Sequence, residues 1–76
     1  MKELVEYIAK SIVDHPDRVN VNVVDDASTL VLELTVADTD MGRVIGKGGR
    51  VVNAMRTLVD VAAERQNKRA TLEIVD

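Results

Sequence analysis

Glycine occupies three of the four positions from 46 to 49, within the run Arg-Val-Ile-Gly-Lys-Gly-Gly-Arg-Val-Val, and this segment constrains the fold more than any other. The residues on both sides are aliphatic or basic and are compatible with helices. Glycine costs about 1 kcal/mol in a helix interior relative to alanine, and it readily takes positive φ angles. We therefore expect two helices separated by a turn whose backbone is bare.

Positive charge is concentrated on the same segment. Residues 41–59 contain four basic side chains and no acidic one, whereas residues 1–40 contain three basic and nine acidic side chains, and the whole chain has a formal net charge of -3. Such a local positive field suits an anion bound at one place on an otherwise acidic protein. The alternative is a solvated helix face that happens to be basic. The four basic residues are Arg43, Lys47, Arg50 and Arg56.

The chain has 76 residues and no cysteine, and a domain of this size buries only about 60% of the surface that its unfolded chain exposes. We therefore expect one domain over residues 1–76, stabilised by aliphatic packing, with no disulfide, metal or other cofactor. The first ten residues mix charged and apolar side chains, so they resemble neither a signal peptide nor a membrane span. A cytoplasmic protein without membrane association is the expectation.

Hydrophobic periodicity predicts three helices and three strands. The first helix is expected to stop at His15-Pro16, because the residue before proline avoids the helical region. The predicted order is α-β-β-α-α-β, an α+β domain of two layers in which helices cover one face of a three-stranded sheet. The predicted elements are a helix at 3–14, strands at 19–23 and 30–36 joined by a turn at 25–28, helices at 41–45 and 50–66, and a strand at 70–74.

The same pattern predicts caps and core residues. Asp38 and Asp40 are the expected N-caps of the short helix, since a carboxylate accepts hydrogen bonds from the free N–H groups of a first turn. The long helix should bury one face, and the first strand should direct alternate residues to the core. The expected core residues are Val51 or Val52, Met55, Leu58, Val59 and Ala62 in the helix, and Val19, Val21 and Val23 in the strand.

Two other glycine-rich sites do not match. A P-loop requires G-x-x-x-x-G-K-[ST], but Gly42 and Gly46 are one residue too close, and Gly48 stands where the metal-binding hydroxyl is needed. A dinucleotide-binding fingerprint needs glycine or alanine where Val51 stands, and a βαβ unit around it. The glycine segment therefore belongs to another class of anion site.

Catalysis is not indicated. His15 is the only histidine and adjoins a proline at a helix end, so we expect an exposed helix terminator rather than a general base. Ser11 and Ser28 have no second histidine with which to form a nucleophile–base pair. Asp38-x-Asp40 lacks the further oxygen ligands of a calcium loop. A non-enzymatic binding function is the better interpretation.

Residues 44–52, Val-Ile-Gly-Lys-Gly-Gly-Arg-Val-Val, lie within the order α-β-β-α-α-β and resemble the G-x-x-G loop and flanking helices of a type II KH domain. The resemblance covers the whole chain, whose length is similar to that of the small bacterial KhpA-like proteins with a single KH domain. It implies a two-layer type II KH fold that binds single-stranded RNA, as an RNA chaperone or post-transcriptional regulator. In KH domains this turn clamps about four nucleotides by their backbone, and the bases lie in an apolar groove.

The resemblance also implies roles for individual residues. Gly46 and Gly49 would shape the turn, while Lys47 and Gly48 would meet the phosphates. Gly42 either allows close packing of the short helix or only weakens it. The residues implied in RNA binding are Arg43, Val44, Ile45, Gly46, Lys47, Gly48, Gly49, Arg50 and Val52. The three valine and isoleucine residues among them are equally compatible with ordinary core packing.

Recognition by aromatic stacking is not available, because Tyr7 is the only aromatic residue. The resemblance implies a homodimer and a larger KhpB-type KH protein as partners, besides single-stranded RNA. The alternative is a KH-fold protein-interaction or dimerisation module that binds little RNA. RNA binding would weaken steeply with salt, whereas association through aliphatic burial would not. Further basic residues that either extend the RNA path or are simply solvated are Arg56, Arg65, Lys68 and Arg69.

Overall fold

The computed structural model describes residues 1–75, which form three α-helices and a three-stranded sheet. The predicted order α-β-β-α-α-β is confirmed, and single 3₁₀ turns lie in three of the connections. The elements are α1 (Lys2–Ile12), β1 (Asn20–Asp26), β2 (Thr29–Thr35), α2 (Met41–Ile45), α3 (Arg50–Arg65) and β3 (Arg69–Ile74), with 3₁₀ turns η1 (Pro16–Arg18), η2 (Asp38–Asp40) and η3 (Lys47–Gly49).

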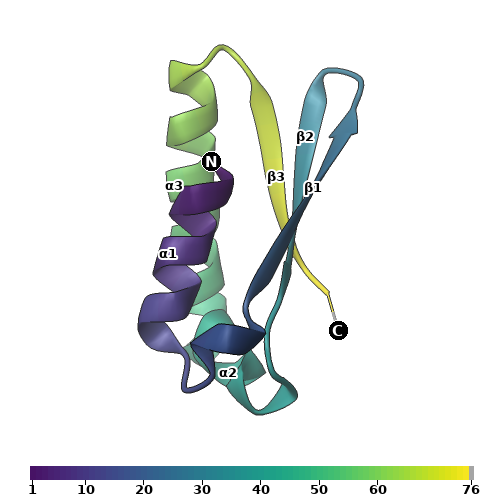
Figure 1. The fold of residues 1–76 in the computed structure, drawn as a ribbon. Coiled ribbons are helices and arrows are strands. Elements are labelled where there is room, and N and C mark those ends of the chain that lie inside the picture. The colour runs from purple at the N-terminus through teal and green to yellow at the C-terminus, as the bar shows by residue number, and fades with distance from the viewer. Residues whose placement is uncertain (76) are drawn as a thin grey trace.

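The sheet is mixed and has the strand order β1-β2-β3. β1 and β2 form an antiparallel hairpin with Val21 opposite Leu34, whereas β2 and β3 run parallel with Leu32 opposite Leu72. A parallel pair needs a crossover connection, and α2 and α3 supply it. α1 and α3 lie side by side along the sheet, and α2 lies at one end of the molecule (Figure 1).

The core lies between the helices and the covered face of the sheet. In α1, Val5 and Ala9 are fully buried, and Ile8 and Ile12 pack around them. The helical spacing of these residues explains why α1 presents one face to the core. The other buried apolar residues are Val21, Leu32, Leu34, Val36, Ala37, Val44, Val52, Met55, Val59, Ala63, Ala70 and Leu72.

Three core predictions are wrong. Leu58 keeps 47% of its surface exposed, and Ala63 rather than Ala62 completes the buried row of α3. An α-helix turns by about 100° per residue, so a row through Val52 and Val59 leaves position 58 on the flank. Val23 is 40% exposed, and it lies in the middle of β1, an edge strand with a neighbouring strand on one side only.

The ends of some elements also differ from prediction. α1 ends at Ile12, two residues earlier than expected, and β1 continues to Asp26. The hairpin turn is therefore short, with Ala27 at a φ of 57°. No helix within residues 1–75 is both long enough and apolar enough to cross a membrane.

Candidate nucleic-acid interface

The glycine turn joins α2 to α3, and its three glycines all have positive φ angles. Gly46, Gly48 and Gly49 have φ angles of 76°, 64° and 79°. The Gly46 N–H donates to the carbonyl oxygen of Gly42 at 2.9 Å, and the Gly49 N–H donates to that of Gly46 at 3.1 Å. Since residues with a Cβ rarely adopt these angles, the three glycines explain why the chain stops one helix and starts the next within four residues.

The glycines differ in what surrounds them. A Cβ on Gly46 would lie 2.9 Å from the backbone nitrogen of Val51 and would also collide with the Val51 side chain. A Cβ on Gly48 would meet nothing within 4 Å, and one on Gly49 would lie 3.6 Å from Nδ2 of Asn53. Gly46 is therefore required by packing, whereas Gly48 leaves a bare and open stretch of backbone.

Basic side chains surround this bare backbone. Lys47, in the centre of the turn, and Arg50, at the start of α3, are both exposed, and Arg43 keeps 56% of its side chain exposed. Within the described residues, no side chain caps the N-terminus of α3, the end of a helix that favours anions. The turn thus combines exposed cations, accessible backbone and a helix N-terminus at one place.

The three aliphatic candidates divide into two groups. Val44 is fully buried and Val52 is 6% exposed, so both belong to the core, while Ile45 is 38% exposed beside the turn. Gly42 lies on an exposed face of α2, and a Cβ there would meet nothing within 4 Å. Close packing therefore does not require a glycine at position 42.

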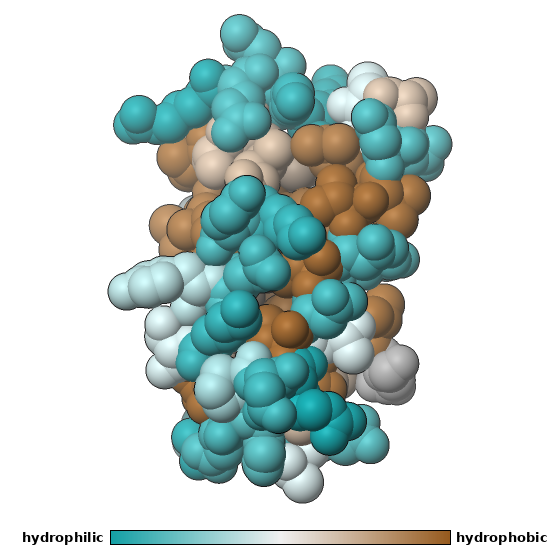
Figure 2. All heavy atoms as spheres, in the orientation of Figure 1, coloured by the Kyte–Doolittle hydropathy of each residue, from teal (hydrophilic) through white to brown (hydrophobic). Residues whose placement is uncertain are grey.

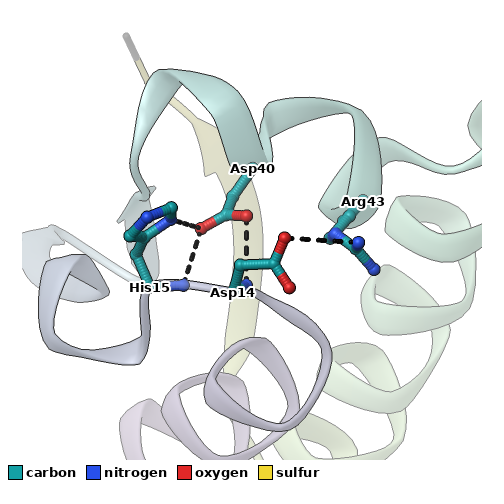
Figure 3. A network of polar contacts seen from close by, with 4 residues as sticks. All are labelled: Asp14, His15, Asp40 and Arg43. Atoms are coloured by element: carbon teal, nitrogen blue, oxygen red, sulfur yellow. Dashed lines mark hydrogen bonds and ion pairs between the residues drawn. The ribbon is translucent and has the colours of Figure 1, made fainter.

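Asp40 has a different role from the predicted one. Asp40 occupies the predicted N-cap position of α2, whereas Asp38 lies inside η2, whose N-cap is Ala37. Within residues 1–75 neither carboxylate makes a capping hydrogen bond to its helix, so the predicted capping interaction is wrong. Instead, the Asp40 carboxylate accepts hydrogen bonds from the backbone N–H groups of Asp14 (3.1 Å) and His15 (3.0 Å). Nδ1 of His15 lies 3.2 Å from the same carboxylate (Figure 3). Asp40 therefore ties the segment after α1 to the start of α2.

The Asp40 carboxylate is fully buried. Burial alone would raise its pKa, but the N–H groups of Asp14 and His15 and the His15 side chain together stabilise the charged form more strongly, so the pKa of Asp40 is lowered. A buried carboxylate whose hydrogen-bonding groups all have partners in this way has a structural role. Sequence reasoning missed it because its partners lie 26 and 25 residues away, and no local pattern signals such a contact.

An ion pair connects the same segment to Arg43 beside the glycine turn. Nη2 of Arg43 lies 3.3 Å from Oδ2 of Asp14, and both side chains are more than half exposed. Figure 3 shows the Asp14 carboxylate turned toward Arg43, on the far side from the Asp40 contacts. One of the cations predicted to meet RNA is therefore already engaged by an acid of the same chain.

The four further basic residues that the sequence offered for the RNA path lie along α3 and beyond it. Nε of Arg56 donates to the carbonyl oxygen of Leu72 at 3.3 Å, so Arg56 lies between α3 and β3. Arg65 ends α3, which by its length of 16 residues separates it from the glycine turn by roughly 24 Å. Lys68 and Arg69 line an open hollow of about 450 Å³ at that end. Its other charged lining residues are Asp60 and Glu64, so the local field is mixed rather than positive.

Apart from Ile45, the large exposed apolar side chains lie away from the turn. Figure 2 shows mainly hydrophilic residues at the end where α2 lies, and apolar residues reaching the surface toward the other end. Tyr7 on α1 is 74% exposed, which leaves the single aromatic ring free of the core. The other large exposed apolar residues are Val23, Val24, Ile45, Leu58 and Val61.

The resemblance of the chain to known proteins agrees with this geometry. Residues 2–74 match the family model described as KhpA/KhpB, KH domain. The chain belongs to this family. KhpA/KhpB relatives named "RNA-binding protein KhpA" are 53% identical in Clostridium perfringens, over 99% of this chain and 100% of the relative, and 51% identical in Halalkalibacterium halodurans, over 100% of both.

A solved structure shows the same fold in a larger protein. The crystal structure of Aquifex aeolicus Era bound to GDP and AlF4⁻ matches with a TM-score of 0.65 at 20% identity. The match covers 96% of this chain and 28% of that chain. At this identity the likeness concerns the fold alone, and it agrees with the KH architecture of the KhpA/KhpB family.

Proposed function

We propose that this protein binds single-stranded RNA and that the turn at residues 46–49 holds the RNA backbone. The observation that carries the proposal is the exposed turn itself, in which Lys47 and the bare backbone of Gly48 lie between Arg43 and Arg50 in an acid-free stretch of an acidic chain. Phosphate oxygens accept hydrogen bonds from such N–H groups and from basic side chains. RNA binding is also what the names of the relatives state.

The bases are proposed to contact aliphatic surface beside the turn. Ile45 is the exposed aliphatic residue there, whereas Val44 and Val52 are buried in the core. Arg56, whose Nε donates to the carbonyl oxygen of Leu72 in β3, is a further basic residue that the RNA path is proposed to reach. Because base-specific hydrogen bonds are not required for such contacts, we propose recognition that tolerates different sequences.

The cellular role that fits this chemistry is non-catalytic. A single small site gives modest affinity, which suits an RNA chaperone or post-transcriptional regulator acting in the cytoplasm. We propose that self-association as a homodimer, or pairing with a larger KhpB-type KH protein, raises the affinity by placing two sites on one RNA. Sedimentation velocity over a range of protein concentrations tests the first association, and co-purification with a tagged KhpB-type protein tests the second.

The test of RNA binding is fluorescence anisotropy of a labelled single-stranded RNA with wild type and with Lys47→Asp/Gly48→Asp. Aspartate tolerates the left-handed backbone better than most residues do, so the variant is expected to fold, which circular dichroism checks. We expect the affinity to fall by roughly tenfold or more. Equal binding by the two proteins would exclude the turn as the clamp.

A matched control separates local from overall charge. Lys2→Asp/Ser28→Asp introduces the same change of charge at exposed positions, the first residue of α1 and the β1–β2 turn, both at the other end of the molecule from α2 (Figure 1). We expect it to bind RNA nearly as wild type does. If both double variants lose binding equally, net charge rather than the turn controls the affinity. If no protein binds RNA, the protein-interaction function becomes the better proposal.

A further inference from the structure

An acidic side chain, that of Asp14, contacts one of the basic residues beside the glycine turn. Oδ2 of Asp14 is 3.3 Å from Nη2 of Arg43, and Arg43 belongs to α2, the helix that ends at the glycine turn. Among the charged residues placed at the turn, Arg43 is the one with an ion pair within residues 1–75. An anion that approaches the turn therefore meets a cation that is already partly neutralised.

The position of Asp14 is fixed by the fold. Its backbone N–H donates to Oδ1 of the buried Asp40, and the next N–H, that of His15, donates to Oδ2. Asp40 directly precedes α2, so the backbone that carries Asp14 is tied to the helix that carries Arg43 (Figure 3). The two charged side chains are consequently held within reach of each other while both remain open to solvent.

We propose that Asp14 is an internal competitor of the RNA phosphate for Arg43. A carboxylate and a phosphate are both anions that match the guanidinium group, so Arg43 engages RNA fully only when the phosphate displaces Asp14. The inference rests on the proposed RNA binding and adds a residue that limits affinity. Its effect is to reduce adhesion to polyanions in general, because every competing anion must first break the pair.

The expected size of the effect is moderate. An ion pair between exposed side chains contributes little free energy in water, so its loss should change RNA affinity by about two- to fivefold. The direction of the change in RNA affinity distinguishes a competitor from a residue that only positions Arg43. A residue that only oriented Arg43 for RNA would lower the affinity when removed, whereas a competitor raises it.

The experiment is a double-mutant cycle read by anisotropy with a labelled single-stranded RNA. The four proteins are wild type, Asp14→Asn, Arg43→Gln and Asp14→Asn/Arg43→Gln. Asp38→Asn is the matched control, because it removes the same charge from an exposed residue two positions before Asp40 that makes no ion pair within the described part of the chain. Circular dichroism confirms the fold of each variant.

We expect Asp14→Asn to bind RNA about two- to fivefold more tightly than wild type, and more tightly than Asp38→Asn. When Arg43 is already replaced by Gln, adding Asp14→Asn should raise the RNA affinity by no more than Asp38→Asn does. In the free protein, the NMR cross-peak of the Arg43 Nε–Hε group should shift in Asp14→Asn and stay in place in Asp38→Asn.

Three outcomes would overturn the inference. The first is that Asp14→Asn binds RNA no more tightly than wild type. The second is that its gain in RNA affinity is no larger than that of Asp38→Asn. The third is that the full gain in affinity is also seen in the Arg43→Gln background. Each of these leaves the proposed function intact as long as Lys47→Asp/Gly48→Asp still lowers the RNA affinity by roughly tenfold or more. Absence of RNA binding by wild type and Asp14→Asn alike would reject both proposals together.

Discussion

Gly46 packs directly against Val51, so that a Cβ on Gly46 would lie 2.9 Å from the Val51 backbone nitrogen and closer still to the Val51 side chain. The contact crosses the glycine turn and joins the end of α2 to the first turn of α3. Gly46 also has a φ of 76° and a ψ of 171°, a combination that is essentially restricted to glycine. The shape of the turn therefore depends on this contact.

Substitution of Gly46 by alanine should destabilise the protein by about 2–4 kcal/mol, through the backbone strain and the collision with Val51. Urea denaturation followed by circular dichroism measures the change. Gly42→Ala is the control, and it should stabilise by roughly 0.5–1 kcal/mol, because position 42 is helical and open. If both alanine variants had the same stability, the strain at Gly46 would be absent in solution.

The salt dependence of RNA binding should report the cations at the turn. Three cations, Arg43, Lys47 and Arg50, surround it. Each neutralised phosphate of a single strand contributes about -0.7, so the slope of log K against log salt should be about -2. Lys47→Gln should bring the slope closer to zero by about 0.7. Anisotropy titrations at several salt concentrations measure this, with Lys10→Gln on α1 as the control that leaves the slope unchanged.

Much of the fold was predictable because local patterns carry it. Alternation in the strands, helical spacing in α1 and α3, and the glycines at 46–49 each constrain their own segment, and the order of elements followed from them. The buried face of α3 was harder to predict, because Leu58 and Val59 are adjacent and both apolar. Only the direction from which the sheet approaches decides that Val59 is buried and Leu58 is exposed.

The candidate site was predictable in part for the same reason. The turn residues are contiguous in sequence, so their chemistry could be interpreted directly. The contacts of Asp40 with His15 and of Asp14 with Arg43 join segments far apart in the chain, and carboxylates before a helix normally indicate caps. Tertiary hydrogen bonds to the segment after α1 outcompeted the local cap.

Val44 and Ile45 are neighbours with opposite environments, the first fully buried and the second 38% exposed. Val44→Ala should lower the free energy of unfolding by about 1–3 kcal/mol. Ile45→Ala should cost less than about 1 kcal/mol of stability, yet weaken RNA binding by roughly two- to fivefold, because an aliphatic contact with the bases is lost. Urea denaturation and anisotropy on both variants measure the two effects, and undiminished RNA affinity in Ile45→Ala would remove Ile45 from the interface.

The buried Asp40 should make the stability depend on pH in the acid range. Its pKa is lower in the folded protein than its ordinary value of 3.8, so the unfolded chain binds the proton more readily and protonation favours unfolding. The contribution of the ionised carboxylate is therefore complete above about pH 5 and is lost as the pH falls through the folded-state pKa, below 3.8. Thermal unfolding of wild type and Asp40→Asn at a series of pH values measures it.

We expect Asp40→Asn to have the lower melting temperature at neutral pH, since an amide oxygen replaces a carboxylate that accepts hydrogen bonds from Asp14 and His15. The difference from wild type should shrink as the solution is acidified, because the wild-type carboxylate then becomes neutral as well. Asp38→Asn, at an exposed position, should show no such convergence. A gap between wild type and Asp40→Asn that stayed constant down to pH 2 would mean that the charge on Asp40 contributes nothing to the tie between α1 and α2.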